Sequence, residues 1–266
     1  PGAYNIVAWT SGLVGDSDQT NDTLNITIDA IPTVATYPYF EDFESGNGGW
    51  VADNTNNGTW GLGAPNDFTI DTAFSGINAW VTDLDNNHLD NDDSWVTSPC
   101  LDFTNLADPV IEMAIWWEVF NNNGGANLQA SIGGGAWFNI SNFGDPNNWY
   151  NSNAIGSAPG GFSEGWTGSG TLGSNGWVIA EHDLDSTAGQ SDVRLRVHFA
   201  SGTINDDGFA FDDIFIYDKP DNDLGVVNFV SPPKGGCSED SVPVVVTIIN
   251  FGSQPQTGFP VTANYT

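Results

Sequence analysis

The sequence predicts an all-β protein, and its composition carries that prediction. Among its 266 residues Gly occurs 32 times and Pro 14 times, whereas Met occurs once. Gly and Pro interrupt helices and favour turns, so many short strands joined by turns are expected. The 11 Trp and 16 Phe residues supply enough apolar volume for a folded core.

The charge balance excludes two classes of partner. Four Lys and Arg residues stand against 34 Asp and Glu residues, which gives a formal net charge of −30 at pH 7. Nucleic acids and anionic membrane surfaces both attract basic proteins, so neither partner is expected. Bound divalent cations or a saline exterior would supply the counter-charge. No run of 18 apolar residues occurs, so no membrane insertion is expected.

The N-terminal residues predict one hairpin followed by a linker. Residues 4–9 and 23–28 are strand-like, and the second run alternates apolar and polar residues. An Asp-, Asn- and Gly-rich loop separates the two runs. A linker begins at Ile31 and ends near Pro38. This piece therefore looks like the closing hairpin of a domain.

The middle of the chain predicts a succession of strands separated by Gly- and Asn-rich loops. Residues 110–119 contain helix formers, but their aromatic and β-branched side chains favour a strand. Residues 193–199 alternate, so four apolar side chains share one face and Arg194, Arg196 and His198 share the other. We expect the two arginines to pair with acidic neighbours across the sheet. The predicted strands are 39–43, 78–82, 94–97, 110–119, 127–132, 176–182, 193–200 and 210–217.

The C-terminal residues predict the start of another module. Residues 223–230 and 242–250 are strand-like, and residues 261–265 form a third candidate strand. Three strands are too few for an independent sandwich. We expect the missing strands to come from downstream sequence or from residues 1–30 of a neighbouring copy. The alternative is that the sequence simply ends at an arbitrary position within the module.

A series of short aromatic and acidic motifs runs through the middle of the chain. The motifs are Phe43-Glu44 with Gly49-Trp50, Trp60 with Pro65, Ser98-Pro99, Ile115-Trp116-Trp117, Trp177 with Asp183-Leu184, and Phe209-Ala210-Phe211-Asp212-Asp213-Ile214. In this order they resemble the MAM-like jelly-roll family, a module of secreted and cell-surface proteins. The Asn- and Gly-rich loops are similar to the bacterial version, found in proteins that Bacteroidota export by type IX secretion.

Both ends of the chain resemble parts of a CARDB-like, immunoglobulin-type repeat. Residues 1–8 resemble its closing hairpin, and residues 223–226 with 246–252 resemble its opening. The resemblances imply three parts: 1–32 as the last strands of one immunoglobulin-like β-sandwich, 33–220 as a central jelly-roll β-sandwich, and 221–266 as the first strands of the next immunoglobulin-like repeat.

The resemblance implies a structural or adhesive repeat module of a secreted bacterial cell-surface protein. Its partners would be neighbouring copies of itself or adjacent repeats, together with surface glycans. Strand complementation would join such modules into an extracellular fibre, and calcium would stiffen it. The alternative is a carbohydrate-binding module of a secreted multidomain enzyme. No catalytic activity is expected of this chain, because a carboxylate pair such as Glu112 and Glu118 arises by chance among so many acids.

The resemblance also implies a structural cation near the first and last strands of the jelly roll. The matching residues are Glu44, with Asp71 and Asp213 as companions. Carboxylates buried beside one another without a cation would be costly. In the alternative, Asp212 and Asp213 accept backbone hydrogen bonds where their strand begins.

A second candidate calcium site comes from the residues themselves. The stretch 83–93 places carboxylate and amide oxygens at nearly every second position, with Asp83, Asp85 and Asp90 as candidate ligands. The alternative is a solvated acidic turn. A single imidazole is no transition-metal site, so His88 in this stretch is expected at the surface.

Several tryptophans are candidates for stacking on sugar rings. They are Trp116, Trp117, Trp137, Trp149, Trp166 and Trp177. Those in dense strands are expected to lie in the core. Trp149 and Trp166 occur in Gly- and Asn-rich loops, so these two are predicted to be the sugar-stacking residues.

Two modifications are also expected. Thr23 and Ser241 lie in an Asp-Ser/Thr-hydrophobe pattern that resembles Bacteroidota O-glycosylation sites. Cys100 and Cys237 are the only cysteines and lie far apart in sequence, so a disulfide between them is possible, whereas a CxxC motif is absent.

Overall fold

The computed structural model describes residues 3–11, 14–29, 31–231 and 243–264. Strands make up nearly all of the regular secondary structure of these residues, and each of the four 3₁₀ helices is only three residues long: η1 (Gln19–Asn21), η2 (Pro159–Gly161), η3 (Gly170–Leu172) and η4 (Asp185–Thr187). The all-β prediction is therefore confirmed. In the described part of the chain no helix has the length and apolar character needed to cross a bilayer.

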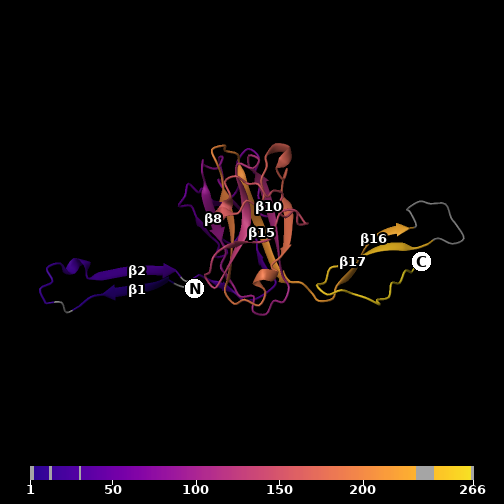
Figure 1. The fold of residues 1–266 in the computed structure, drawn as a ribbon, viewed down its shortest axis with the longest axis horizontal. Coiled ribbons are helices and arrows are strands. Elements are labelled where there is room, and N and C mark those ends of the chain that lie inside the picture. The colour runs from indigo at the N-terminus through magenta and orange to yellow at the C-terminus, as the bar shows by residue number, and fades with distance from the viewer. Residues whose placement is uncertain (1–2, 12–13, 30, 232–242, 265–266) are drawn as a thin grey trace.

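A sandwich of two sheets forms the centre of the molecule (Figure 1). One sheet has the order β13-β10-β15-β7-β6, with β4 also paired to β15. Its strands are β4 (Tyr39–Glu41), β6 (Gly61–Gly63), β7 (Ala79–Val81), β10 (Pro109–Glu118), β13 (Val178–Asp183) and β15 (Gly208–Asp218). All of these strands pair antiparallel with their neighbours.

The second sheet has the order β12-β11-β14-β8-β5, and β9 pairs with β14 and with β3. Its strands are β3 (Thr33–Val34), β5 (Val51–Asp53), β8 (Asp93–Thr97), β9 (Cys100–Leu101), β11 (Gly125–Ile132), β12 (Phe138–Asn139) and β14 (Val193–Ala200). The β3–β9 pair is parallel. Except for β11 and β12, the neighbouring strands of this sheet are not consecutive in the chain, so loops from many parts of the chain meet at the sheet edges.

The core between the sheets is rich in aromatic rings. Phe211 is fully buried, and its ring centroid lies 5.6 Å from that of Trp50 and 5.7 Å from that of Trp60. Phe43 packs edge-on at 5.8 Å, and Trp80 stacks at 6.4 Å. Such pairs stabilise the core beyond the burial of their apolar area. Several motifs of the predicted series therefore provide this core.

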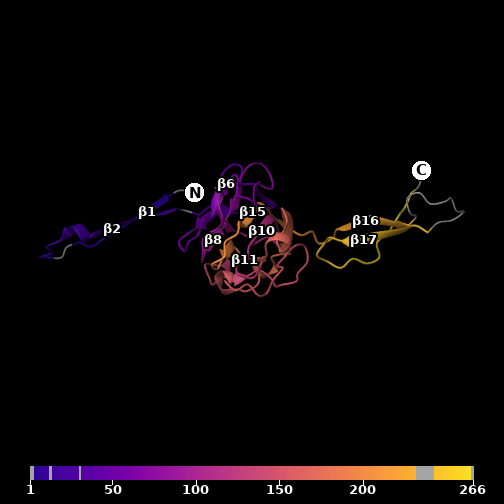
Figure 2. The same ribbon diagram turned by 90° about the horizontal axis from the view of Figure 1, so that it is seen from above.

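A separate two-stranded hairpin lies on each side of the sandwich (Figures 1 and 2). β1 (Ala3–Trp9) pairs antiparallel with β2 (Thr23–Asp29), and β16 (Leu224–Ser231) pairs antiparallel with β17 (Val245–Asn250). The sequence predicts the N-terminal hairpin and both strands of the C-terminal one, and the structure adds that these two strands pair. The prediction of a third strand at residues 261–265 is wrong for residues 261–264, which form no strand, and residue 265 lies outside the described residues. The proposed domain boundaries stay a prediction.

Candidate functional site

The outer face of the second sheet carries the candidate site, because strand alternation brings its polar side chains there. Along β14 the residues Val193, Leu195, Val197 and Phe199 point into the core, as predicted. Arg194, Arg196 and His198 lie on the opposite face. On the neighbouring strand β8, Val96 is in the core, which places the alternate residues Asp93, Trp95 and Thr97 on the outer face.

Arg196 is held between two indole rings on this face. Its guanidinium carbon lies 4.7 Å from the ring centroid of Trp95 and 4.3 Å from that of Trp137. Its Nε donates a hydrogen bond of 2.8 Å to Gln129 Oε1. Arg196 is only 8% exposed, and this burial lowers its pKa to about 10. The cation therefore orients Trp95 rigidly rather than offering its own charge to solvent.

A loop around η2 covers the part of the face that lies over β11. Asn127 and Gln129 are both buried, and each donates a hydrogen bond to the carbonyl oxygen of Pro159. The next residue, Gly160, has φ +59°, and a Cβ there would lie 2.5 Å from Gln129 Nε2. Only glycine permits this close approach without strain. An open pocket lies beside this covered region and is lined by residues of β5, β8 and β14.

His198 is a buried neutral imidazole at the border of the covered region. Its Nε2 donates to Asp93 Oδ1 at 2.7 Å, whereas its Nδ1 has no hydrogen-bond partner among the residues that the structure describes. Burial lowers the pKa of His198 to about 4, and the Asp93 carboxylate offsets only part of that effect. The ring also packs against Trp95, with centroids 5.0 Å apart. Contact with the buried His198 ring therefore helps to fix the position of the Trp95 ring.

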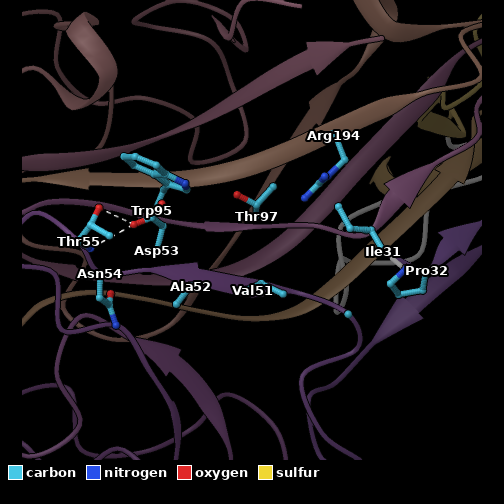
Figure 3. Close-up of a pocket in the computed structure, with 11 residues that line it drawn as sticks. Ile31, Pro32, Val51, Ala52, Asp53, Asn54, Thr55, Trp95, Thr97 and Arg194 are labelled. Atoms are coloured by element: carbon cyan, nitrogen blue, oxygen red, sulfur yellow. Dashed lines mark hydrogen bonds between the residues drawn. The ribbon is translucent and has the colours of Figure 1, made fainter. Parts of the chain in front are cut away.

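An open pocket of about 600 Å³ occupies the remaining face (Figure 3). Trp95, Asp53 and Thr55 lie toward one end, and Arg194 extends from the other end near Ile31 and Pro32. The complete lining is Ile31, Pro32, Gly49, Val51, Ala52, Asp53, Asn54, Thr55, Trp95, Thr97 and Arg194. Pockets of about 300–1,000 Å³ with apolar walls and a few polar groups are typical small-molecule sites.

Two polar side chains at the first end are fixed by their own turn. Asp53 Oδ1 accepts hydrogen bonds from the amide and hydroxyl of Thr55, at 3.1 Å and 2.7 Å. Asn54 donates to the carbonyl oxygen of Trp60 and accepts from its amide. These contacts preorganise this end of the pocket, and Asp53 Oδ2 makes no hydrogen bond to the described residues.

The expected pairing of the two arginines with acids across the sheet is wrong. Directly opposite Arg196 lie Thr97 and Gln129, and opposite Arg194 lies Ser131. Arg194 Nε instead donates to the carbonyl oxygen of Ser98 at 2.9 Å. Within the described residues neither arginine has a carboxylate oxygen within 4.0 Å.

The two predicted sugar-stacking residues are corrected by the structure. Trp149 is 3% exposed and Trp166 is fully buried, and both belong to the hydrophobic core. Their indole nitrogens donate to the backbone carbonyls of Ile140 and Asn148, which satisfies them inside the fold. Gly- and Asn-rich loops do surround these tryptophans, but the loops fold back over the sandwich. Neither ring is available to a sugar.

Two of the three residues matched to the cation site of the jelly-roll resemblance, Glu44 and Asp213, accept hydrogen bonds from the protein. Glu44 Oε1 accepts from the amides of Ile77 and Asn78, at 2.8 Å and 2.6 Å. Asp213 Oδ1 accepts from the hydroxyl of Ser75 at 2.8 Å, and Asp71 is exposed. No three acidic, His or Cys side chains in the described residues surround a common point. A cation bound by Glu44, Asp71 and Asp213 stays a prediction.

Asp212 accepts hydrogen bonds from backbone amides, as the alternative to a cation site predicts. Its Oδ2 accepts from the amides of Phe74 and Ser75, at 3.0 Å and 3.2 Å. Burial raises the pKa of Asp212 to about 6.

The acidic stretch 83–93 folds as a turn stabilised by its own carboxylates. Asp83 Oδ1 accepts from the amides of Asp85 and Asn86, both at 3.1 Å. The side chain of Asp90 makes no hydrogen bond to the described residues, although its carbonyl oxygen accepts from Asn57. The expectation of a surface histidine is wrong, because His88 is fully buried against Phe199. Calcium binding stays a prediction for this stretch.

The modification predictions divide between described and undescribed residues. Thr23 is exposed at the start of β2, and its glycosylation stays a prediction. Ser241 and Cys237 lie outside the described residues. Cys100 is partly buried on β9.

No family model and no curated protein matches this sequence. Solved structures with a similar fold include the K1 cleaved adhesin domain of Lys-gingipain from Porphyromonas gingivalis W83, at 15% identity and a TM-score of 0.39, over 68% of this chain and 97% of that chain. TmCBM61 in complex with β-1,4-galactotriose matches at 13% identity and a TM-score of 0.41, over 67% and 94% of the two chains.

A third similar structure is the C-terminal family 22 carbohydrate-binding module of Clostridium thermocellum Xyn10B. It matches at 15% identity and a TM-score of 0.39, over 68% of this chain and 93% of that chain. The similarity is one of fold, and no function is transferred from it.

Proposed function

We propose that the chain is an adhesive module that binds glycans in the pocket on the outer face of the second sheet. The observation that supports this is the combination of Trp95 with fixed polar groups in one open site of about 600 Å³. Sugar rings present apolar C–H faces that pack on an indole, while their hydroxyls need hydrogen-bond partners such as Asp53. The secreted, cell-surface setting belongs to the same proposal and is supported by the motif resemblance.

The rigid support behind Trp95 strengthens the proposal. The ring is packed by Arg196 on one side and lies 5.0 Å from His198, so it is already ordered without ligand. Binding that orders few side chains loses little conformational entropy. A preformed aromatic platform beside open polar groups therefore suits a ligand with both apolar and hydroxyl surfaces.

The test is a glycan array probed with the native chain and with Trp95→Ala. We expect binding by the native chain and at least a tenfold loss of affinity in the variant, confirmed by titration calorimetry with the best glycan. Trp9→Ala is the matched control, because it removes an exposed tryptophan from β1, away from the pocket. Equal binding by native chain and Trp95→Ala would place any glycan site elsewhere, and absence of binding to every glycan would refute the function.

A second candidate function, assembly into a fibre, is favoured by the exposed faces of the hairpins. On β1 and β2 the cross-strand pair Ile6 and Ile26 lies on one face with Tyr4 and Leu24, and all four side chains are exposed. Val226 and Phe229 are likewise exposed on β16. An isolated two-stranded hairpin is marginally stable, so such faces need a cover. We propose a neighbouring repeat or copy of this chain as that cover, with calcium as a stiffening ion, and the oligomeric state in solution as the test.

A further inference from the structure

Arg194 stands apart from the other basic residues of the described chain. Lys219 forms an ion pair with Asp183, at 3.5 Å between Nζ and Oδ1. Arg196 is enclosed by Trp95 and Trp137. Arg194, by contrast, is only partly buried and lines the open pocket. Among the described basic residues, Arg194 is thus the one that lines an open pocket without a carboxylate oxygen within 4.0 Å.

The hydrogen bonds of Arg194 leave its outer edge available. Nε is used by the Ser98 carbonyl oxygen at 2.9 Å, which fixes the direction of the guanidinium. The two terminal nitrogens make no hydrogen bond to the described residues. A guanidinium presents its donors in a planar fork that matches the two oxygens of a carboxylate. The available edge of Arg194 therefore suits a planar anion more than a single hydroxyl.

The net charge of the chain makes this arrangement informative. In a protein with 34 acidic residues and a net charge of −30, most cations are expected to have an acidic neighbour. Arg194 has none within 4.0 Å in the described part of the chain. The other charged residue that lines the pocket is Asp53, toward the opposite end (Figure 3). The pocket is therefore polarised along its length.

We infer that the pocket selects glycans that carry a carboxylate, such as uronic acid units, and that Arg194 binds that carboxylate. The inference rests on the proposed glycan-binding function and names its ligand class. The carboxylate lies at the Arg194 end, because Asp53 repels it from the other end. Hydroxyl groups of the ligand donate to Asp53, and its ring packs near Trp95. One orientation of an acidic sugar is thereby favoured.

The experiment compares native chain, Arg194→Gln and Lys219→Gln on an array of neutral and carboxylate-bearing glycans. Titration calorimetry then uses tri-galacturonic acid and its methyl ester, which differ in the charge of their carboxyl groups. We expect the acidic trimer to bind at least tenfold more tightly than the ester, and Arg194→Gln to lose that preference. Lys219→Gln, with the same change in net charge outside the pocket, keeps it. Near-UV circular dichroism establishes that each variant is folded, and Arg194→Lys supplies a second variant that keeps the charge but loses the fork.

The results distinguish failure of the acidic-ligand inference from failure of the proposed glycan-binding function. Neutral glycans bound as tightly as acidic ones, with Arg194→Gln unchanged, would overturn the acidic-ligand inference and leave glycan binding intact. Failure to bind any glycan would refute both. Binding of poly-glutamate as tight as that of the acidic trimer would also overturn the inference, because the site would then recognise charge without a sugar. Retained preference in Arg194→Lys together with its loss in Arg194→Gln would support the charge of residue 194 as the determinant.

Discussion

The buried imidazole of His198 couples the candidate face to pH. Its pKa is about 4 in the folded chain, against an ordinary value near 6.5. Between these two values the unfolded chain binds the proton more readily, so the free energy of unfolding rises with pH in this window. Titration of His198 leaves the free energy of unfolding undiminished above about pH 6.5 and lowers it as the pH falls toward 4.

Replacement of this imidazole isolates its contribution. We expect His198→Gln to remove a pH dependence of up to about 1.4 kcal/mol per pH unit between pH 4 and 6.5. Urea denaturation of both proteins at pH 4, 5, 6.5 and 7.5 measures it, and the native-minus-variant difference cancels the titration of the many acids they share. The same difference at every pH would contradict the assignment of a depressed pKa.

The sequence correctly predicts which side chains of β14 face the core, because strands alternate. It does not predict which side chains are buried by loops that fold back over the sandwich. The alternation of β14 correctly separated Val193 and Leu195 from Arg194 and Arg196. Exposure of Trp149 and Trp166 was inferred from their loop context, but loops that return over a sandwich bury their aromatics. Trp95 lies in a short strand, where alternation is a weak signal, although it follows the same alternation as its neighbour Val96. That alternation was the signal that could have found it.

At the scale of elements, strand length decided what the sequence could predict. The long strands β10, β11, β14 and β15 were expected within two residues of their observed ends. Strands β5 and β6 have three residues each, too few for any period to show. The pocket includes β5, so its position depended on pairing between distant segments that no local pattern reveals. The polar outer face of the second sheet could be predicted from the alternation of β14. The pocket could not, because it depends on which distant strands pair.

The hairpin β1–β2 allows a paired test of the proposed assembly. Ile26→Lys places a charge on the exposed apolar face, whereas Asn25→Lys places the same charge on the adjacent residue, opposite Val7 on the other face. If the apolar face is an interface, Ile26→Lys shifts the chain to monomer and Asn25→Lys does not. Light scattering after size-exclusion chromatography measures the mass. A native chain that is monomeric at millimolar concentration would refute the role of the hairpin.

For the whole molecule, a net charge of −30 makes stability depend on cations. Sodium chloride raises the melting temperature by screening self-repulsion. If calcium also binds specifically, calcium chloride at 100 times its dissociation constant adds about 2.7 kcal/mol, or about 5–10 °C beyond sodium chloride of equal ionic strength. Melting curves with calcium, with magnesium and with chelator measure this. Equal melting temperatures at equal ionic strength would leave calcium no structural role.

The two hairpins also fix the symmetry of any array they build. Because β1–β2 and β16–β17 differ in sequence and lie on opposite sides of the sandwich, a contact between them is heterologous rather than two-fold. Each added copy leaves one hairpin of each kind uncovered, so growth does not close on itself unless the rotation per step completes a ring. An open array of this kind would be a polar chain with two distinct ends, and the proposed glycan pocket would recur once per copy along it.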